Sequence, residues 1–256
     1  MTSVQDLNLS QNRLKTVSAL GALHNLTKLD LSVNHIASLQ GLEPLMQLAE
    51  VNLSHNPLID LQAAATWTQV RVMILTNTQV QSLSPLAAWT QAKVLELRQN
   101  RISEVRSLSG LQSLQVLNLG TNRLKDASSL SKLPQLTEVD LSGNPGLDVR
   151  SLSGLTQVQI LNLSANRLEN ITPLRMLNRV EYLDLSNNKI VNPSPLGDLK
   201  QLKTLLLSSN RIPDKIEAYG GISSLNNLEM LVVDIADDTG WPCPVKRIVC
   251  EEVQFY

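Results

Sequence analysis

Apolar residues recur along this chain with a period of 22 positions, and each period ends in the pattern Leu-x-Leu-x-x-Asn. An internal repeat of this length indicates a stacked repeat architecture and not an ordinary globular core. The interval between Asn56 and Asn100 is twice as long and has Thr78 at its midpoint, so ten repeats follow one another without an insertion. The asparagines, which define the turn position of each repeat, are Asn12, Asn34, Asn56, Asn100, Asn122, Asn144, Asn166, Asn188 and Asn210.

Within one repeat, the spacing of the apolar residues changes along the chain. The Leu-x-Leu part alternates with period two, which predicts a short strand. Leu108, Leu111 and Leu114 are instead three positions apart, which suits a 3₁₀ or extended segment better than a long α-helix. One strand per repeat, always in the same direction, predicts an α/β solenoid. Its parallel sheet would line the concave side, and short 3₁₀ or extended segments would form the convex side.

The asparagine at the turn position has a physical role in this prediction. The chain turns sharply there and leaves buried backbone N–H and C=O groups without partners in the sheet. An amide side chain both donates and accepts hydrogen bonds, so stacked asparagines can satisfy these groups. The loss of one should cost about 1–3 kcal/mol. Because Thr78 keeps one donor and one acceptor, we expect it to be tolerated there.

The two ends of the chain depart from the pattern. After Asn210, an eleventh coil fits if four residues are inserted within 213–221, and the pattern decays at Ala236. We therefore expect eleven coils over residues 1–236 and a C-terminal cap over 237–256. The first coil has only Val4, Leu7 and Leu9 before Asn12 and shows no cap. Terminal coils need covering, so we expect a fragment of a longer protein, or an additional N-terminal domain or partner that covers this end.

These repeats resemble the leucine-rich-repeat superfamily from Leu7 to Ala236. The 22-residue length and the Gly-Leu pairs that begin at Gly41, Gly110 and Gly154 are similar to two subclasses, the eukaryotic phosphatase-regulator type and the bacterial internalin type. The resemblance implies a horseshoe or arc with the ligand on the concave sheet. The segment 241–250, which contains Cys-Pro-Val-Lys, resembles the tail that closes some bacterial repeat proteins, and this implies an exported or cell-surface bacterial protein.

Cys243 and Cys250 are the only cysteines, and they admit two interpretations. A metal site usually needs four ligands, whereas the three histidines (His24, His35 and His55) all lie in early coils. A disulfide that closes the end of the core is the favoured interpretation. It would contribute roughly 2–3 kcal/mol and would require an oxidising compartment. No cofactor or metal is expected.

Charge, hydropathy and the lack of catalytic motifs narrow the class of function that this sequence predicts. The net charge of −1 gives no indication of a nucleic-acid or membrane-surface partner. The sequence contains no apolar run of about 18 residues, so insertion of this chain into a membrane is not expected. The sequence shows no acid/base pair, nucleophile constellation or phosphate-binding loop, so an enzyme is not expected. Trp67 and Trp89 replace leucines at equivalent positions and should fill the core, while the histidines should be exposed and non-catalytic.

Residues two, four and six positions before each turn position should face the concave side. The middle of these columns is polar and mildly acidic, but apolar residues interrupt the face in two patches. We predict that a protein partner binds there. The candidate contact residues are Val72, Ile74, Val94, Glu96, Arg98, Tyr182, Asp184, Leu206, Met230 and Val232.

A basic series directly follows the turn positions, namely Arg13, Arg101, Arg123, Arg167, Lys189 and Arg211. One interpretation is a solubilising ladder in which each base lies near acids of adjacent coils. The other is a rim of charge beside an apolar strip, which favours a protein ligand.

The sequence therefore predicts a non-catalytic module that binds a protein partner, exported or on a bacterial cell surface. An intracellular scaffold similar to the phosphatase-regulator type, located in the cytoplasm, is an alternative. A structural module that spaces or displays neighbouring domains is another.

Overall fold

The computed structural model describes residues 3–213, 219–234 and, for the backbone alone, 249–252. The chain forms two compact units. Unit 1 contains 1–124 and 132–136, and unit 2 contains 125–131 and 137–256. Each unit is built from the same repeating coil of about 22 residues, and each is described by itself.

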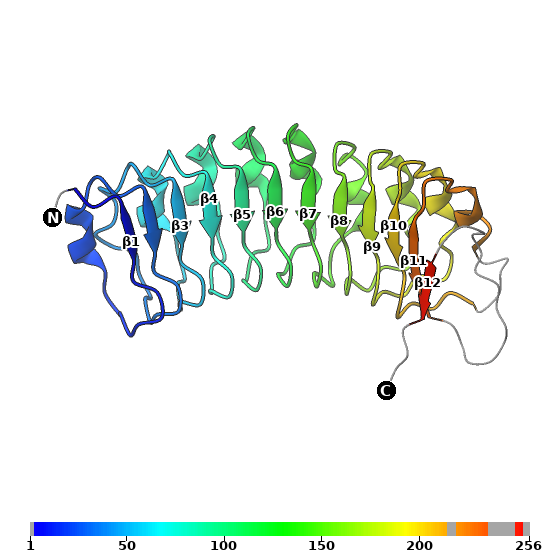
Figure 1. Cartoon of the computed structure of the whole chain (residues 1–256), viewed down its shortest axis with the longest axis horizontal. Coiled ribbons are helices and arrows are strands. Elements are labelled where there is room, and N and C mark those ends of the chain that lie inside the picture. Colours follow the sequence, from blue (N-terminus) through cyan, green and yellow to red (C-terminus); the bar gives the residue numbers. More distant parts are fainter. Residues whose placement is uncertain (1–2, 214–218, 235–248, 253–256) are drawn as a thin grey trace. The chain divides into compact units, whose positions relative to one another are not determined.

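Every coil contributes one short parallel strand. Neighbouring strands pair in register at the repeat distance, so that Leu95 of one strand lies beside Leu117 of the next. In unit 1 the strands are β1 Asp6–Asn8, β2 Lys28–Asp30, β3 Glu50–Asn52, β4 Val72–Ile74, β5 Val94–Glu96 and β6 Val116–Asn118 (Figure 1). In unit 2 they are β7 Glu138–Asp140, β8 Ile160–Asn162, β9 Tyr182–Asp184, β10 Thr204–Leu206, β11 Met230–Val233 and β12 Val249–Glu252. Strands β1 to β11 confirm the predicted strand in each coil.

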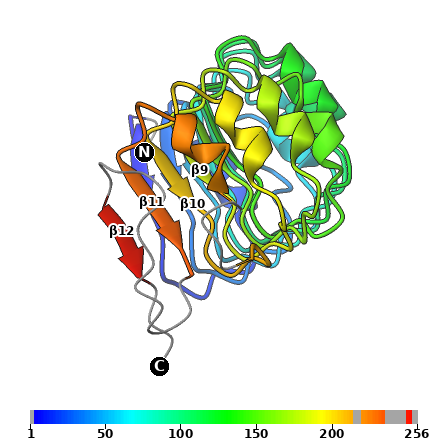
Figure 2. The ribbon, with the colours of Figure 1, turned by 90° about the vertical axis from the view of Figure 1, so that its right-hand side faces the viewer.

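Short 3₁₀ segments form the opposite side of most coils. They are η1 Ser18–Ala22, η2 Gln62–Thr66, η3 Ser84–Ala88, η4 Arg106–Gly110, η5 Ser128–Lys132, η6 Val149–Leu152, η7 Thr172–Met176, η8 Ser194–Asp198 and η10 Ile222–Ser224. Figure 2 shows, for unit 2, that β9, β10 and β11 lie on one side of the coils and these segments on the other. The predicted combination of a parallel sheet with 3₁₀ segments is confirmed.

The leucines between the strands and the 3₁₀ segments form a buried core. In the coil from Asn100 to Asn122, each of the leucines Leu108, Leu111, Leu114 and Leu117 is completely buried. Trp67 and Trp89 are also completely buried, as predicted. Their indole N–H groups donate to the carbonyls of Leu42 and Ala64 at 3.0 Å. The donor that each buried indole carries is therefore satisfied.

Within each unit, the asparagines at the turn positions form a column of hydrogen-bonded amides, which we call the amide column. Asn122 is typical. Its Nδ2 donates to the carbonyls of Leu97 and Leu119, both at 2.9 Å, and its Oδ1 accepts from the Ile102 N–H at 3.0 Å. Such an amide joins the core-side backbone of its own coil to that of the preceding coil, whereas Asn12, in the first coil, donates to the Leu9 and Ser10 carbonyls of its own coil. This arrangement matches the role predicted for the asparagines.

The coil of Thr78 shows what a missing amide changes. The Thr78 hydroxyl lies within hydrogen-bonding distance of the Asn100 Oδ1 and of the Leu75 carbonyl. The Leu58 N–H, which in other coils would donate to the next amide, instead donates to the Asn56 carbonyl at 2.8 Å. Threonine is therefore accommodated by a local change in the preceding coil.

The residue before each turn position adopts a left-handed backbone conformation that the sequence pattern did not predict. Nine such residues are not glycine, and they are Gln11, Val33, His55, Asn77, Gln99, Thr121, Ala165, Asn187 and Ser209. Gly143 takes the same place in its coil, with φ 63. The turn geometry is thus imposed by the stacked coils, since side chains as different as Val33 and Asn77 adopt it.

The C-terminal part holds a strand that was not predicted. Strand β12 pairs with β11 in parallel, with Cys250 beside Leu231 in the backbone register. The segments 237–248 and 253–256 of the expected cap lie outside the described residues, so the boundary at 236 stays a prediction. In the parts of the chain that are described, no helix has the length and apolar character needed to cross a membrane.

Candidate binding face

The strands present their outward side chains on one face, which we call the strand face. In β5 the central residue, Leu95, is buried, while Val94 and Glu96 on either side are half-buried. The same alternation occurs in the strands from β2 to β10. The residues four and six positions before each turn position therefore form the strand face, as predicted. The prediction is only partly correct for the residues two positions before the turn, because Ser32, Ser54 and Ser142 are buried.

In unit 1, the predicted apolar contact residues lie together. Val72 is the register partner of Val94, which in turn lies beside Val116, so three valines form a continuous row across β4, β5 and β6. Ile74 lies beside Glu96 in the next row. Glu96 and Arg98 both have interaction partners within the chain, so neither is a free charge.

A hollow of about 300 Å³ adjoins this apolar row on strands β1 to β4. Val72 and Ile74 line one end, and Asp6, Asp30 and Lys28 are among the charged residues that line the rest. Lys28 Nζ lies 2.9 Å from Glu50 Oε2, and this hydrogen bond and charge raise the pKa of Lys28 above its ordinary value. Of the residues that line the hollow, only Val72 and Ile74 at its apolar end were predicted from the sequence.

In unit 2, the predicted contact residues form two rows and not one patch. Leu206 and Val232 are register partners, and Asp184 lies on the other side of Leu206. In the outer row, Thr204 separates Tyr182 from Met230. Burial, followed by the charge of Asp184, raises the pKa of Tyr182.

The outer row has an exposed apolar residue at each end, and only one of the two, Met230, was predicted as a contact residue. Ile160 is the register partner of Tyr182 and is 41% exposed, and Met230 is 37% exposed. Ile160 was not among the predicted contact residues, although it belongs to the same column as Tyr182. The outer row of unit 2 therefore offers two exposed apolar side chains and one phenol, with Thr204 between them.

The basic series differs from the ladder of paired charges that one interpretation predicted. Among the charged residues that the structure describes, only Lys189 of this series lies within 4 Å of a carboxylate, with its Nζ 3.6 Å from Glu169 Oε1. Acidic residues do occur in other adjacent coils, but among the described residues only Glu169 comes within 4 Å of the series. A direct ion pair with an adjacent coil therefore occurs at Lys189, and the solubilising role of the series stays an interpretation.

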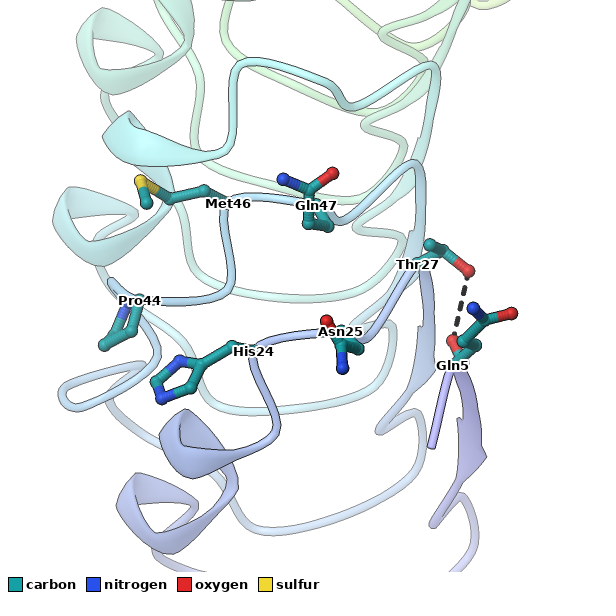
Figure 3. A pocket seen from close by; sticks show the side chains of 7 residues that line it. All are labelled: Gln5, His24, Asn25, Thr27, Pro44, Met46 and Gln47. Atoms are coloured by element: carbon teal, nitrogen blue, oxygen red, sulfur yellow. Dashed lines mark hydrogen bonds between the residues drawn. The ribbon is translucent and has the colours of Figure 1, made fainter. Parts of the chain in front are cut away.

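A recess of about 570 Å³ opens on the flank of the first three coils of unit 1. Figure 3 shows His24, Pro44 and Met46 on the side of the 3₁₀ segments and Gln5 beside the first strand. The Thr27 hydroxyl donates to the Gln5 carbonyl at 3.1 Å, which closes the strand end of the recess. Its lining is mainly amides and apolar groups, and no set of charged side chains converges there.

The histidines, the possible metal ligands and the two cysteines are the remaining candidates for chemistry. His24, His35 and His55 are exposed, as expected. Within the described ranges, no three His, Cys, Asp or Glu side chains are grouped so that they could hold a metal ion. Cys243 and the side chain of Cys250 lie outside the described residues, so the disulfide stays a prediction.

Comparison with known protein families identifies the repeat. A model described as Leucine rich repeat matches residues 90–145, one described as Leucine Rich repeats (2 copies) matches 2–44, and one described as Leucine Rich Repeat matches 179–199. No curated protein gives a significant sequence match.

Solved structures show the same fold. An internalin (InlF) from Listeria monocytogenes has a TM-score of 0.58 and 21% identity, over 98% of this chain and 88% of that chain. Internalin C2 from the same organism has a TM-score of 0.58 and 24% identity, over 85% of this chain and 84% of that chain. The plant peptide hormone receptor RGFR1, in complex with RGF2, has a TM-score of 0.64 and 18% identity, over 92% of this chain and 46% of that chain. With its 22-residue coils, amide column and parallel strands, this chain belongs to the leucine-rich-repeat superfamily.

Proposed function

We propose that this chain is a non-catalytic module that binds a protein partner on its strand face. The observation that carries the proposal is the clustering of apolar side chains at outward-facing strand positions, where a polar residue would satisfy the fold equally well. Val72, Val94 and Val116 form one such row, and Leu206 and Val232 form another. Exposed apolar clusters on an otherwise polar surface favour association with another protein.

The surroundings of the apolar rows support the same conclusion. Hydrogen-bonded acids such as Asp184, whose Oδ1 accepts from the Ser186 N–H at 2.8 Å, keep the neighbouring surface polar. Apolar contacts inside a polar rim are the usual anatomy of a protein interface. Leucine-rich-repeat neighbours include a peptide hormone receptor in complex with RGF2, which is consistent with a peptide or protein ligand.

The proposal includes export to the bacterial surface or beyond. Its support is the Cys-Pro-Val-Lys tail with Cys243 and Cys250 and the fold shared with internalins. A disulfide between the two cysteines would suit an oxidising compartment. Protein purified from its native compartment under non-reducing conditions should be lighter by two hydrogen atoms than the reduced chain. Free thiols in that material would contradict export.

Peptide selection tests the binding role. A display library is selected against the wild-type chain, and the enriched peptides are then measured against the variant L206E/V232E and against V72E/V94E. We expect at least one of these variants to lose binding by about tenfold or more, because a carboxylate in an apolar contact is left without a partner.

The control for this experiment is M176E, which places one glutamate on η7, on the other side of the coils. Met176 is 50% exposed, so the substitution should leave both the fold and the binding unchanged. Peptides that bind both strand-face variants as tightly as the wild type, or that lose binding only to M176E, would refute a site on the strand face.

A further inference from the structure

Three cations lie one coil apart along the turns of unit 2. Arg167, Lys189 and Arg211, which we call the cation row, each follow a turn position directly. The Lys189 N–H donates to the Leu168 carbonyl at 2.8 Å, and the Arg211 N–H donates to the Ile190 carbonyl at 2.9 Å. These bonds hold successive members of the row at the spacing of neighbouring strands, about 4.8 Å.

The charge of the cation row is largely unneutralised. Lys189 has only the exposed Glu169 at 3.6 Å, and in the described part of the chain no carboxylate lies within 4 Å of Arg167 or Arg211. Some other cations of unit 2 do have such partners, since Arg150 Nη2 lies 2.9 Å from Asp148 Oδ2 and Lys203 Nζ lies 2.6 Å from Glu181 Oε2. The row therefore retains positive charge that a partner could neutralise.

The cation row lies on the same coils as the apolar rows of unit 2. Arg211 lies five positions after Leu206, a distance of at most about 17 Å along an extended chain. One partner segment can therefore contact both. Such a segment would carry an apolar side chain for Leu206 and Val232 and negative charge for the row.

The surroundings favour a peptide over a nucleic acid. Asp140 and Asp184 occupy the middle of the strand face and would repel a phosphate backbone laid across it. Sites for single-stranded nucleic acid also combine cations with several aromatic stacking surfaces, whereas among the described residues of unit 2 only Tyr182 and the buried Tyr219 are aromatic.

We propose that the cation row binds an acidic segment of the protein partner, a proposal that rests on the binding function proposed above and specifies the chemistry of the ligand. Arg167 and Arg211 are two coils apart, roughly 10 Å. On an extended peptide, carboxylates two or four positions apart span about 7–13 Å, so two of them can reach both arginines. Each guanidinium can then hold a carboxylate through two parallel hydrogen bonds.

The test uses a fluorescein-labelled peptide that carries a leucine anchor followed by three glutamates at alternate positions. The wild type is compared with R167E/R211E by fluorescence anisotropy at about 20 mM and about 150 mM salt, because exposed pairs are screened as ionic strength rises. We expect the double variant to bind about tenfold more weakly at low salt, as two exposed ion pairs of up to about 1 kcal/mol each would give. The difference should shrink at the higher salt.

Two controls make the outcome specific. The variant R175E/R179E changes the net charge equally at exposed positions outside the row, and it should bind within about twofold of the wild type. The same peptide with glutamines in place of glutamates should bind the wild type about as weakly as the acidic peptide binds R167E/R211E. Circular dichroism checks that each variant is folded.

Several outcomes would overturn the proposal. These are an equal loss in both arginine variants, equal binding of the glutamine peptide, or no binding of the acidic peptide to the wild type. Tighter binding of a single-stranded oligonucleotide of equal charge, lost in R167E/R211E, would assign the row to nucleic acid instead. If the acidic peptide gives one of these outcomes while the binding of selected peptides still depends on Leu206 and Val232, the proposed binding function stands. Only the acidic nature of its ligand is then refuted.

Discussion

The amide column and the strand face belong to the same coils, yet they differ in how much their residues vary. The column repeats one residue, and the exception Thr78 changes the hydrogen bond of Leu58 in the coil before it. The strand face instead places Val94, Asp184 and Lys28 at outward positions of otherwise similar strands. The difference indicates that invariant positions stabilise the stack, while variable positions are available for recognition.

Removing one buried amide should have the largest effect on stability. In N122A, the carbonyls of Leu97 and Leu119 and the N–H of Ile102 lose their partner, so the free energy of unfolding should fall by about 3 kcal/mol or more. Denaturant unfolding followed by circular dichroism measures this. The control N12A removes an exposed amide at the start of the column and should cost under about 1 kcal/mol. Equal losses of unfolding free energy in N122A and N12A would show that burial does not determine how much an amide of the column stabilises the fold.

A methyl group at Gly41 should be the next most damaging change. Gly41 has φ +91, and a Cβ there would lie 2.6 Å from the Ser18 Cβ. We expect G41A to lower the free energy of unfolding by about 2 kcal/mol, through backbone strain and overlap. Gly110, which lies at a different position of its coil and has no positive φ, is the control. The nearest atom to a Cβ there, the Ala87 carbonyl oxygen, is 3.6 Å away, so G110A should stay within about 0.5 kcal/mol of the wild type. A larger cost in G110A would show that the glycine preference has another origin.

Completing the amide column should stabilise the chain by a smaller amount. In T78N, the new Oδ1 can accept from the Leu58 N–H, as Asn100 Oδ1 accepts from the Val80 N–H at 3.1 Å. We expect the free energy of unfolding to rise by about 1 kcal/mol, measured by the same denaturant titration. A destabilised T78N would show that the coils around Thr78 have adapted to threonine.

The smallest expected effect is a titration on the strand face. The raised pKa of Tyr182 means that the folded state favours the neutral phenol, so this stability is fully present below the ordinary value of 10.0 and is lost as pH rises through the folded pKa. In D184N the pKa of Tyr182 should fall but stay above its ordinary value, because burial is the larger cause. Phenolate absorbance of each protein, minus that of its Y182F counterpart, isolates this titration. An unchanged pKa of Tyr182 in D184N would show that the charge of Asp184 does not act on the phenol.

Much of the fold follows from the sequence because its determinants are periodic. The spacing of Asn100 and Asn122 predicts the strand pairing, and the leucines spaced by three predict the 3₁₀ segments. Strand β12 was missed because the pairing of 249–252 with β11 continues the sheet without the Leu-x-Leu-x-x-Asn pattern. The left-handed residues were missed because most of them, such as Val33, are not residue types that favour this conformation.

The candidate site was less predictable because it depends on neighbours and not on periodicity. The adjacency of Val72 and Val94 follows from the repeat register, and the structure agrees. The gap that Thr204 leaves between Tyr182 and Met230 follows from the same register but was overlooked. Whether a described carboxylate comes within 4 Å of Arg167 or Arg211 depends on side-chain conformation, which a residue pattern does not encode.

Oxidative footprinting of two methionines in unit 2 tests the central claim most directly. Met230 lies on the strand face and is 37% exposed, while Met176 lies in η7 and is 50% exposed, so both react in the free protein. With a saturating peptide from the display selection, we predict that oxidation of Met230 slows severalfold while oxidation of Met176 is unchanged. Protection of Met176 with Met230 still fully reactive would contradict binding on the strand face.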